Sequence, residues 1–182
     1  MQIITGKYRA RKLVAVDSLE TRPTLARVKE SVFNLIFDKI AGSVVLDLFA
    51  GSGSFGAECI SRGAFEVYFV DQSEKAIKTI KTNTQKMTEK FEIIKASFVD
   101  ALNNFERKNL KFDVVFLDPP YESDFAIKAL ELLEKKKLLN PEAVVVVEHK
   151  FANDLQNMSD CYIIKKSKKY GIAYVDILEY TE

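Results

Sequence analysis

The sequence predicts an α/β fold built on a doubly wound, mostly parallel seven-stranded sheet. Apolar segments alternate with amphipathic segments between residues 44 and 148. This alternation is typical of a parallel sheet covered by helices on both faces. A glycine-rich turn follows the first apolar segment. At the C-terminal end, two strand-like segments are separated only by Tyr170 and Gly171, a distance too short for a parallel crossover, so they predict an antiparallel hairpin.

An extension of 41 residues precedes the sheet, and we expect residues 1–41 to form a single domain with the core at 42–182. Residues 2–15 read as a short hairpin with Gly6 in its turn. Thr24 is the expected N-cap of the helix that follows, which ends before Gly42. The residues expected on its buried face are Val28, Val32, Leu35, Ile36 and Ile40.

The core then alternates between two kinds of element. The apolar periodicity predicts strands at 44–49, 66–71, 92–95, 112–117 and 143–148, and helices at 54–62, 73–87, 98–107 and 124–136. The last two strands are expected at 162–169 and 172–180. A parallel sheet closed by such a hairpin is the architecture of the Rossmann-like methyltransferase type, whereas a dinucleotide dehydrogenase more often continues with another strand–helix unit.

Composition and charge exclude several classes of function. The chain is 47% hydrophobic and 29% charged, as in globular proteins, and it has no apolar run long enough to span a membrane. Nothing after the basic N-terminal residues resembles a signal peptide, which predicts the cytoplasm. A lone His149 and two distant cysteines argue against a histidine triad or a metal site. Residues 1–40 hold eight basic and four acidic side chains, which favours a polyanionic partner at one end.

The glycine-rich turn, residues 46–56, predicts a ligand site. Gly51, Gly53 and Gly56 satisfy the G-x-G-x-x-G spacing that allows close approach of a ligand to the backbone. Asp71 ends the next strand about twenty residues later, where an acid can hold ribose hydroxyls. A helix-capping role is the alternative for Asp71, and this spacing alone also fits a dinucleotide.

Asp47 favours S-adenosylmethionine as the ligand. It lies in the strand directly before the glycine turn. There its carboxylate can accept hydrogen bonds from the amino end of that ligand, whereas it would repel the pyrophosphate of a dinucleotide. The C-terminal hairpin points in the same direction.

Residues 118–121, DPPY, follow the fourth predicted strand, beside the switch point where doubly wound folds bind ligands. Asp118 and Pro119 each precede a proline, which holds the backbone extended and fixes where the carboxylate and the carbonyl point. Both groups are acceptors that match the two N–H donors of a planar exocyclic amine. Tyr121 can stack on a base taken out of its helix. The motif, completed by Pro120, therefore predicts methyl transfer to an amine on a flat ring, catalysed mainly by positioning.

Four segments together resemble one known family. Residues 4–13, 21–36, 45–64 and 112–121 have the order and spacing seen in the RsmD family, bacterial 16S rRNA guanine-N2 methyltransferases. The resemblance implies S-adenosyl-L-methionine as cofactor and transfer to the exocyclic N2 amine of a guanine in 16S rRNA of the small ribosomal subunit.

The resemblance also implies roles for individual residues. The positions of the cofactor site, from the methionine end through the glycine loop and the ribose to the adenine, are Arg22, Pro23, Thr24, Asp47, Phe49, Ala50, Gly51, Ser52, Gly53, Asp71, Gln72, Ala96, Ser97 and Phe98. The catalytic motif is Asp118, Pro119, Pro120 and Tyr121. Lys95 departs from the family, because many relatives carry an acid near the end of the third strand.

Arg9, Arg11 and Lys12 are expected to meet RNA phosphates, and a solvated hairpin surface is the alternative. The lysine run at 165–169 is better explained as an exposed edge strand protected by charge. With a small basic extension, we expect the substrate to be a small-subunit particle and the protein to be a monomer that binds no membrane.

Three other functions share some of these features. An amino methyltransferase of the same motif could act on adenine or cytosine in DNA or RNA, although the chain has no segment to spare for a DNA target-recognition domain. A protein-glutamine methyltransferase usually has Asn in place of Asp118. A non-catalytic RNA-binding module could keep the same fold.

Overall fold

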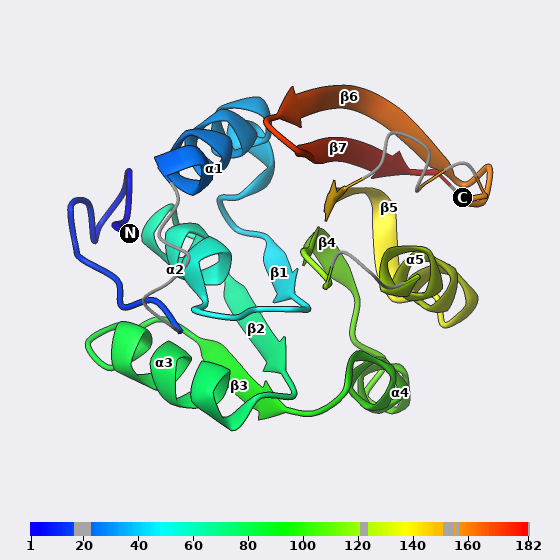
Figure 1. The fold of residues 1–182 in the computed structure, drawn as a ribbon. Coiled ribbons are helices and arrows are strands. Elements are labelled where there is room, and N and C mark those ends of the chain that lie inside the picture. The colour runs from blue at the N-terminus through cyan, green and yellow to red at the C-terminus, as the bar shows by residue number, and fades with distance from the viewer. Residues whose placement is uncertain (17–22, 121–123, 151–154, 156, 182) are drawn as a thin grey trace.

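The computed structural model describes residues 1–16, 23–120, 124–150, 155 and 157–181, and residues 23–27 by their backbone alone. The predicted sheet is confirmed, with strand order β3-β2-β1-β4-β5-β7-β6 (Figure 1). The strands are β1 (Val44–Asp47), β2 (Glu66–Asp71), β3 (Phe91–Lys95), β4 (Phe112–Leu117), β5 (Leu139–His149), β6 (Tyr162–Tyr170) and β7 (Ala173–Tyr180). β1 to β5 run parallel, and β7 lies antiparallel between β5 and β6.

Helices cover both faces of the sheet (Figure 1). They are α1 (Pro23–Leu35), the short 3₁₀ helix η1 (Phe37–Lys39), α2 (Ser54–Ser61), α3 (Glu74–Thr84), α4 (Phe98–Arg107) and α5 (Phe125–Lys135). Successive strand residues point to opposite faces, so Val45 packs into the core under α1, α2 and α3, while Leu46 packs into the core under α4 and α5. The central strands β1, β2 and β4 are therefore buried on both sides, which explains their nearly continuous apolar sequences.

Two expectations for the first helix are wrong. α1 begins at Pro23, so Thr24 lies inside the first turn and is not the N-cap. Proline suits the first helical position because its missing N–H has no partner there in any case. Leu35 is 41% exposed, whereas Phe33 is buried in its place. The helix ends at Leu35 and η1 continues the chain, so the apolar period changes at that point.

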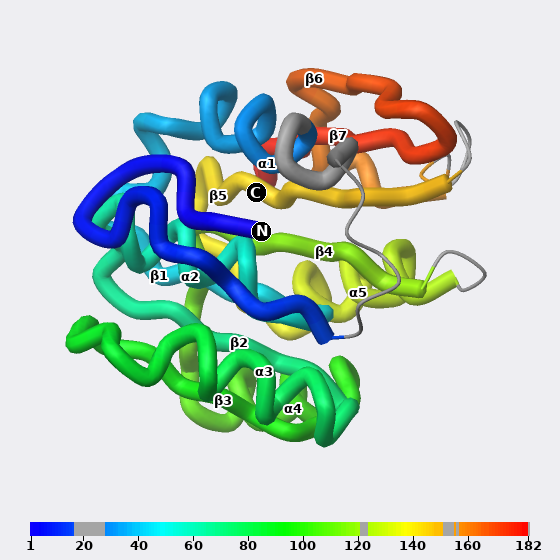
Figure 2. The backbone as a smooth tube through the Cα atoms, turned by 60° about the vertical axis from the view of Figure 1, so that its left-hand side comes forward, coloured from blue at the N-terminus to red at the C-terminus, as the bar shows by residue number. Residues whose placement is uncertain are grey.

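The N-terminal segment, residues 1–16, pairs with itself and then packs on α2 and α3 (Figure 2). Ile3 N–H donates to the Arg11 carbonyl at 3.0 Å, and a single antiparallel bridge joins Gln2 to Lys12. The expected hairpin is confirmed in its pairing but has no regular strand among residues 1–16. Gly6 could not be replaced, because a Cβ there would meet the Ser61 carbonyl at 1.8 Å.

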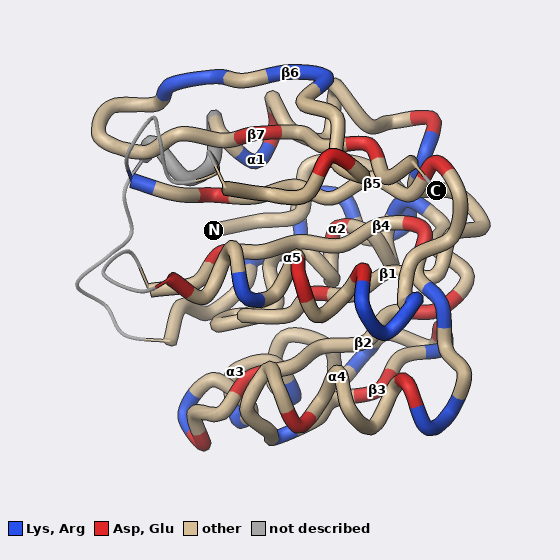
Figure 3. Tube along the Cα trace, turned by 90° about the vertical axis from the view of Figure 1, so that its right-hand side faces the viewer, with Lys and Arg blue, Asp and Glu red and all other residues tan. Residues whose placement is uncertain are grey.

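The C-terminal hairpin places β6 at one edge of the sheet. Its lysines form a basic stripe along that edge (Figure 3), as expected for a strand protected by charge. Behind it, His149 Nε2 lies 2.9 Å from Asp176 Oδ2, which joins β5 to β7 through a buried pair. In the part of the chain that the structure describes, every helix is too short or too polar to cross a bilayer.

Candidate functional site

Two adjoining cavities lie at the carboxyl ends of the parallel strands, with volumes of about 510 and 640 Å³. They share four lining residues, which are Phe49, Gly51, Asp118 and Glu148. The first cavity reaches the N-terminal segment and α1, and the second reaches the ends of β2 and β3. This position is the switch point of the doubly wound sheet, where such folds bind their ligands.

The three glycines of the loop between β1 and α2 have different roles. Gly51 and Gly53 have φ of 52° and 72°, a left-handed conformation that favours glycine. Gly51 lines both cavities, and a Cβ added to it would meet nothing within 4 Å. Gly56 has another function, because a Cβ there would lie 2.2 Å from the ring of Phe69. The loop is thus bare toward the cavities and tightly packed beneath.

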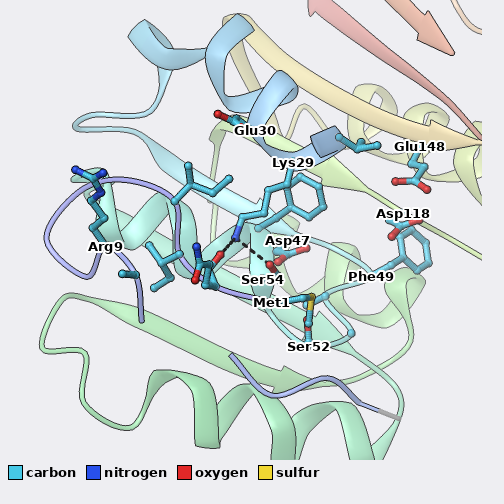
Figure 4. A pocket seen from close by; sticks show the side chains of 18 residues that line it. Met1, Arg9, Lys29, Glu30, Asp47, Phe49, Ser52, Ser54, Asp118 and Glu148 are labelled. Carbon is cyan, nitrogen blue, oxygen red and sulfur yellow. Dashed lines mark hydrogen bonds between the residues drawn. The ribbon is translucent and has the colours of Figure 1, made fainter. Parts of the chain in front are cut away.

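Asp47 is buried under this loop and lines the first cavity (Figure 4). One carboxylate oxygen accepts the Gly56 N–H at 3.0 Å. Burial, opposed mainly by this hydrogen bond, raises the pKa of Asp47 to about 7. A cationic ligand group in the first cavity would stabilise the ionised form, which fits the predicted amino end of S-adenosylmethionine.

Asp71 ends β2 and lines the second cavity. Its two oxygens accept the Gly51 N–H at 2.9 Å and the Ser73 N–H at 2.8 Å. The N-cap of α3 is Ser73, whose hydroxyl accepts from the Ala76 N–H, so Asp71 supports the cap without providing it. Gln72 is exposed beside it and lines the same cavity.

Three aromatic rings form one wall of the second cavity, which we call the aromatic wall: Phe49, Phe98 and Phe125. Their ring centroids lie 5.1 to 6.4 Å apart. Ala96 and Ser97 lie beside them, and Ser97 caps α4 by accepting the Asp100 N–H. A flat ring can stack on such a wall. The assignment of adenine to Ala96, Ser97 and Phe98 stays a prediction.

The DPPY motif begins directly after β4. Asp118 is exposed and lines both cavities, Pro119 is buried, and Pro120 is exposed toward the second cavity. The structure therefore brings the predicted acid to the boundary between the two cavities. Tyr121 lies outside the described residues.

Other predicted residues are placed less fully. Arg22 lies outside the described residues, and Pro23 and Thr24 are described by their backbone in α1 alone. Ala50 is buried, and it lines the first cavity together with the half-buried Ser52. Lys95, which departs from the family, forms an ion pair with Glu74 at 2.6 Å.

The basic residues of the N-terminal segment do not act alike. Arg9 is exposed and lines the first cavity (Figure 4). Lys12 is exposed, whereas Arg11 is half-buried with its guanidinium 5.6 Å from the centre of the Tyr8 ring. Arg9 and Lys12 are therefore open to a polyanion, and Arg11 also contributes to packing.

Glu58 holds the N-terminal segment against the core, a role that sequence reasoning missed. Its fully buried carboxylate accepts the N–H groups of Ile4 and Thr5 and pairs with Lys29 at 3.0 Å and Arg62 at 2.9 Å. Burial would raise the pKa of Glu58, but these partners outweigh burial and lower it. The Arg62 pair at i, i+4 was visible in the sequence, whereas the contacts with Lys29 and residues 4–5 were not.

Glu148 was missed as well. It is the penultimate residue of β5, only 8% exposed, and it lines both cavities. An acid near the end of an otherwise apolar strand was the signal that could have found it. Phe125 of the aromatic wall gave no signal, because it reads as an ordinary first residue of a helix.

Comparisons with known proteins agree with this geometry. The family described as "Conserved hypothetical protein 95" matches residues 1–179. Ribosomal RNA small subunit methyltransferase D of Haemophilus influenzae is 36% identical over 177 residues, covering 96% of this chain and 91% of that protein. The protein of the same name from Escherichia coli K12 is 31% identical over 180 residues, covering 96% and 87%. A solved methyltransferase structure from Escherichia coli superposes with a TM-score of 0.88 at 25% identity, covering 100% of this chain and 98% of that one.

Proposed function

The chain belongs to the RsmD family, and from this premise we propose that it transfers a methyl group from S-adenosyl-L-methionine to the exocyclic N2 amine of a guanine in 16S rRNA. The observation that carries the proposal is the place of Asp118, which lines both cavities at the end of β4. An acceptor at that boundary lies beside the middle of a donor whose methionine end occupies the first cavity and whose adenine occupies the second, where it can hold an amine next to the methyl group.

The described residues fit the cofactor. S-adenosylmethionine supplies a methyl group on a positively charged sulfur. Asp47, which lines the first cavity, suits the ammonium group of the donor. Arg22, Pro23 and Thr24 are assigned to the methionine end of the donor as a whole. The bare turn at Gly51 lets the backbone approach closely, while Asp71 and Gln72 can hold ribose hydroxyls. The adenine is assigned to the aromatic wall, beside Ala96 and Ser97.

Catalysis then depends mainly on position. The Asp118 carboxylate and the Pro119 carbonyl accept the two N–H groups of the amine, which orients its nitrogen toward the methyl carbon. Tyr121 is assigned to stack on the base, which must leave its helix to reach the cavity. The surplus proton of the methylated amine leaves through Asp118 to solvent, because this side chain is exposed.

The RNA is assigned to the side of the N-terminal segment. Arg9 is an exposed cation that lines the first cavity, and Lys12 is a second exposed cation of the same segment. Phosphate contacts of this kind position RNA without reading its sequence. Because so few cations give little affinity for protein-free RNA, we propose a small-subunit particle as the substrate. We also propose a monomeric enzyme that acts in the cytoplasm. Equal rates on protein-free 16S rRNA would count against the particle.

One experiment tests the proposal. Labelled S-adenosylmethionine is offered to protein-free 16S rRNA, to small-subunit particles and to duplex DNA in parallel, and the modified nucleoside is identified. We expect N2-methylguanosine in the particles. N6-methyladenine or N4-methylcytosine would instead indicate another amino methyltransferase of this motif.

A variant assigns the role of the acid. Asp118→Ala should bind the donor within about twofold of the wild type while turnover falls by at least about a hundredfold, since lost positioning of the amine acts on the reaction step. Full activity in Asp118→Ala would remove Asp118 from the mechanism. The exposed Asp38→Ala, in the distant η1, is the matched control.

A further inference from the structure

Glu148 supplies a second carboxylate at the reaction site, one that neither the glycine loop nor the DPPY motif explains. β4 and β5 are paired with Leu117 opposite Val147, so Asp118 and Glu148 follow partnered residues on neighbouring parallel strands. Both line the two cavities, and Figure 4 shows them among the residues of the first. Strands lie about 4.8 Å apart, so the two side chains start close enough to contact neighbouring atoms of one base.

The two carboxylates differ in their surroundings. Asp118 is exposed, as suits a group that passes a proton to solvent, whereas Glu148 is only 8% exposed. A hydrogen bond made where water is excluded is stronger than one made in water. Failing to form it also costs more free energy. A buried acceptor is therefore suited to recognition of one atom of the substrate.

The edges of the purine bases differ at the atom beside the reacting amine. In guanine, the neighbour of the N2 amine is N1–H, a hydrogen-bond donor. In adenine, the neighbour of the N6 amine is N1 with a lone pair, an acceptor. Two adjacent carboxylates thus match the two adjacent donors of guanine, whereas in adenine one of them would face a lone pair.

We propose that Glu148 is the residue that selects guanine, by accepting the N1–H of the target base while Asp118 accepts from its N2 amine. This inference rests on the proposed function and adds a specificity-determining contact to it. A site built to accept a hydrogen bond from a substrate group discriminates strongly against an analogue without that donor. Here the analogue would turn a lone pair toward the Glu148 carboxylate.

The test uses 2-aminopurine, which keeps the N2 amine but carries a lone pair at N1. Small-subunit particles are reconstituted with 16S rRNA that contains guanine or 2-aminopurine at the methylated position, mapped beforehand with the wild type. The quantity measured is the ratio of kcat/KM for guanine to that for 2-aminopurine. We expect a wild-type ratio of at least about a hundred. In Glu148→Gln the amide can donate to N1 of 2-aminopurine, so the ratio should narrow by at least about tenfold.

The controls separate recognition from folding. Glu142→Gln changes an exposed acid on the same strand and should keep the wild-type ratio. Thermal unfolding and the Kd for S-adenosylmethionine are measured for every variant. An unchanged ratio of kcat/KM values in Glu148→Gln overturns the inference. A Glu148→Gln variant whose only defect is weaker binding of S-adenosylmethionine overturns it as well.

The wild type alone decides the matter if the variant does not fold. A wild-type enzyme that methylates guanine and 2-aminopurine at similar rates overturns the role of Glu148 while the proposed function stands. A wild-type enzyme that forms no N2-methylguanosine at all contradicts the proposed function itself, so the two failures are distinguishable.

Discussion

The carboxylate of Asp71 accepts the N–H of Gly51 at 2.9 Å, which ties the end of β2 to the turn of the glycine loop. The other oxygen of Asp71 accepts the Ser73 N–H at 2.8 Å. One side chain therefore fixes the loop that faces both cavities and supports the start of α3. The residue that we assign to the ribose is also the one that shapes the surface to which we assign the rest of the donor.

Asp71→Asn should weaken donor binding by roughly 10- to 100-fold, since a hydrogen bond to a charged group contributes about 1.5–3 kcal/mol. The amide keeps one acceptor oxygen for two N–H partners, so one contact is lost. Isothermal titration with S-adenosylhomocysteine measures the change, and Glu92→Gln, an exposed acid on β3, is the control.

S-adenosylhomocysteine without its ribose hydroxyls distinguishes the two roles of Asp71, holding the loop and binding the ribose. If the carboxylate binds the ribose, the wild type should bind this compound more weakly than S-adenosylhomocysteine itself. The affinity of Asp71→Asn should then differ little between the two compounds. Equal losses in both proteins would confine Asp71 to holding the loop. Unchanged affinity of Asp71→Asn for the full compound would contradict both roles.

Glu58→Gln should lower the free energy of unfolding by about 3–5 kcal/mol, because it leaves the buried Lys29 ammonium without a charge partner. Urea unfolding measures this loss. The pair Glu92–Lys108 provides the control, since Glu92→Gln breaks a contact of 3.7 Å between two exposed side chains and should cost about 0.2–1 kcal/mol.

The same variant should disturb the site. Glu58 accepts the N–H groups of Ile4 and Thr5, and Ile4 lines the first cavity. Donor affinity should therefore fall together with stability. A double variant with Lys29→Met should be less destabilised than the sum of the single variants by at least about 1 kcal/mol, and simple additivity would argue against a coupled pair.

The regular elements of the core could be predicted from the sequence because local patterns define them. β2, β4 and α4 have the predicted bounds, since each apolar or amphipathic run is followed by a polar residue, which is Gln72, Asp118 and Lys108 respectively. The β5 strand runs from Leu139 to His149, longer than expected. Pairing of Leu139 with Phe112 of β4 extends its start through polar residues such as Asn140, and pairing of His149 with Tyr174 of β7 extends its end. Pairing partners far away in the chain leave no local signal.

The candidate site could be predicted only where a motif carries it. Asp47, Asp71 and Asp118 belong to motifs, and the structure places all three along the cavities. Glu148 and Phe125 reach the same place through the topology of the sheet, which brings the ends of separate strands together. Thr24 was misassigned because Pro23 and Thr24 are both acceptable helix starts, and local propensity does not choose between them.

Gly56→Ala should destabilise the protein by about 1–3 kcal/mol, although alanine is the better helix former. The added methyl group would lie 2.2 Å from the ring of Phe69, which is itself fully buried. Thermal unfolding measures the effect. Unchanged or increased stability would show that Phe69 can move aside and that the close packing under the glycine loop is not needed.

Asp47 predicts an unusual pH dependence of stability. Its pKa is raised to about 7 by burial, so the folded chain holds this proton more tightly than the unfolded chain does. The resulting contribution to the free energy of unfolding is fully present below about pH 4, declines as pH rises, and is lost near pH 7. Asp47→Asn removes it, so the variant should gain stability relative to the wild type, by a few kcal/mol at most, between pH 5 and pH 7.5. A constant difference over that range, measured by urea unfolding, would contradict the raised pKa.

Donor binding should reverse the protonation of Asp47. A donor ammonium beside the carboxylate favours the ionised form, so binding releases a proton and the affinity of the wild type should rise roughly tenfold from pH 5.5 to pH 7. Above that range the donor's own amino group, with a pKa of about 7.7–8.0, begins to lose its charge. Titration calorimetry in buffers of different ionisation enthalpy counts the released proton, which should be absent in Asp47→Asn. A wild-type affinity independent of pH would place the ammonium elsewhere and leave Asp47 with the Gly56 N–H as its function.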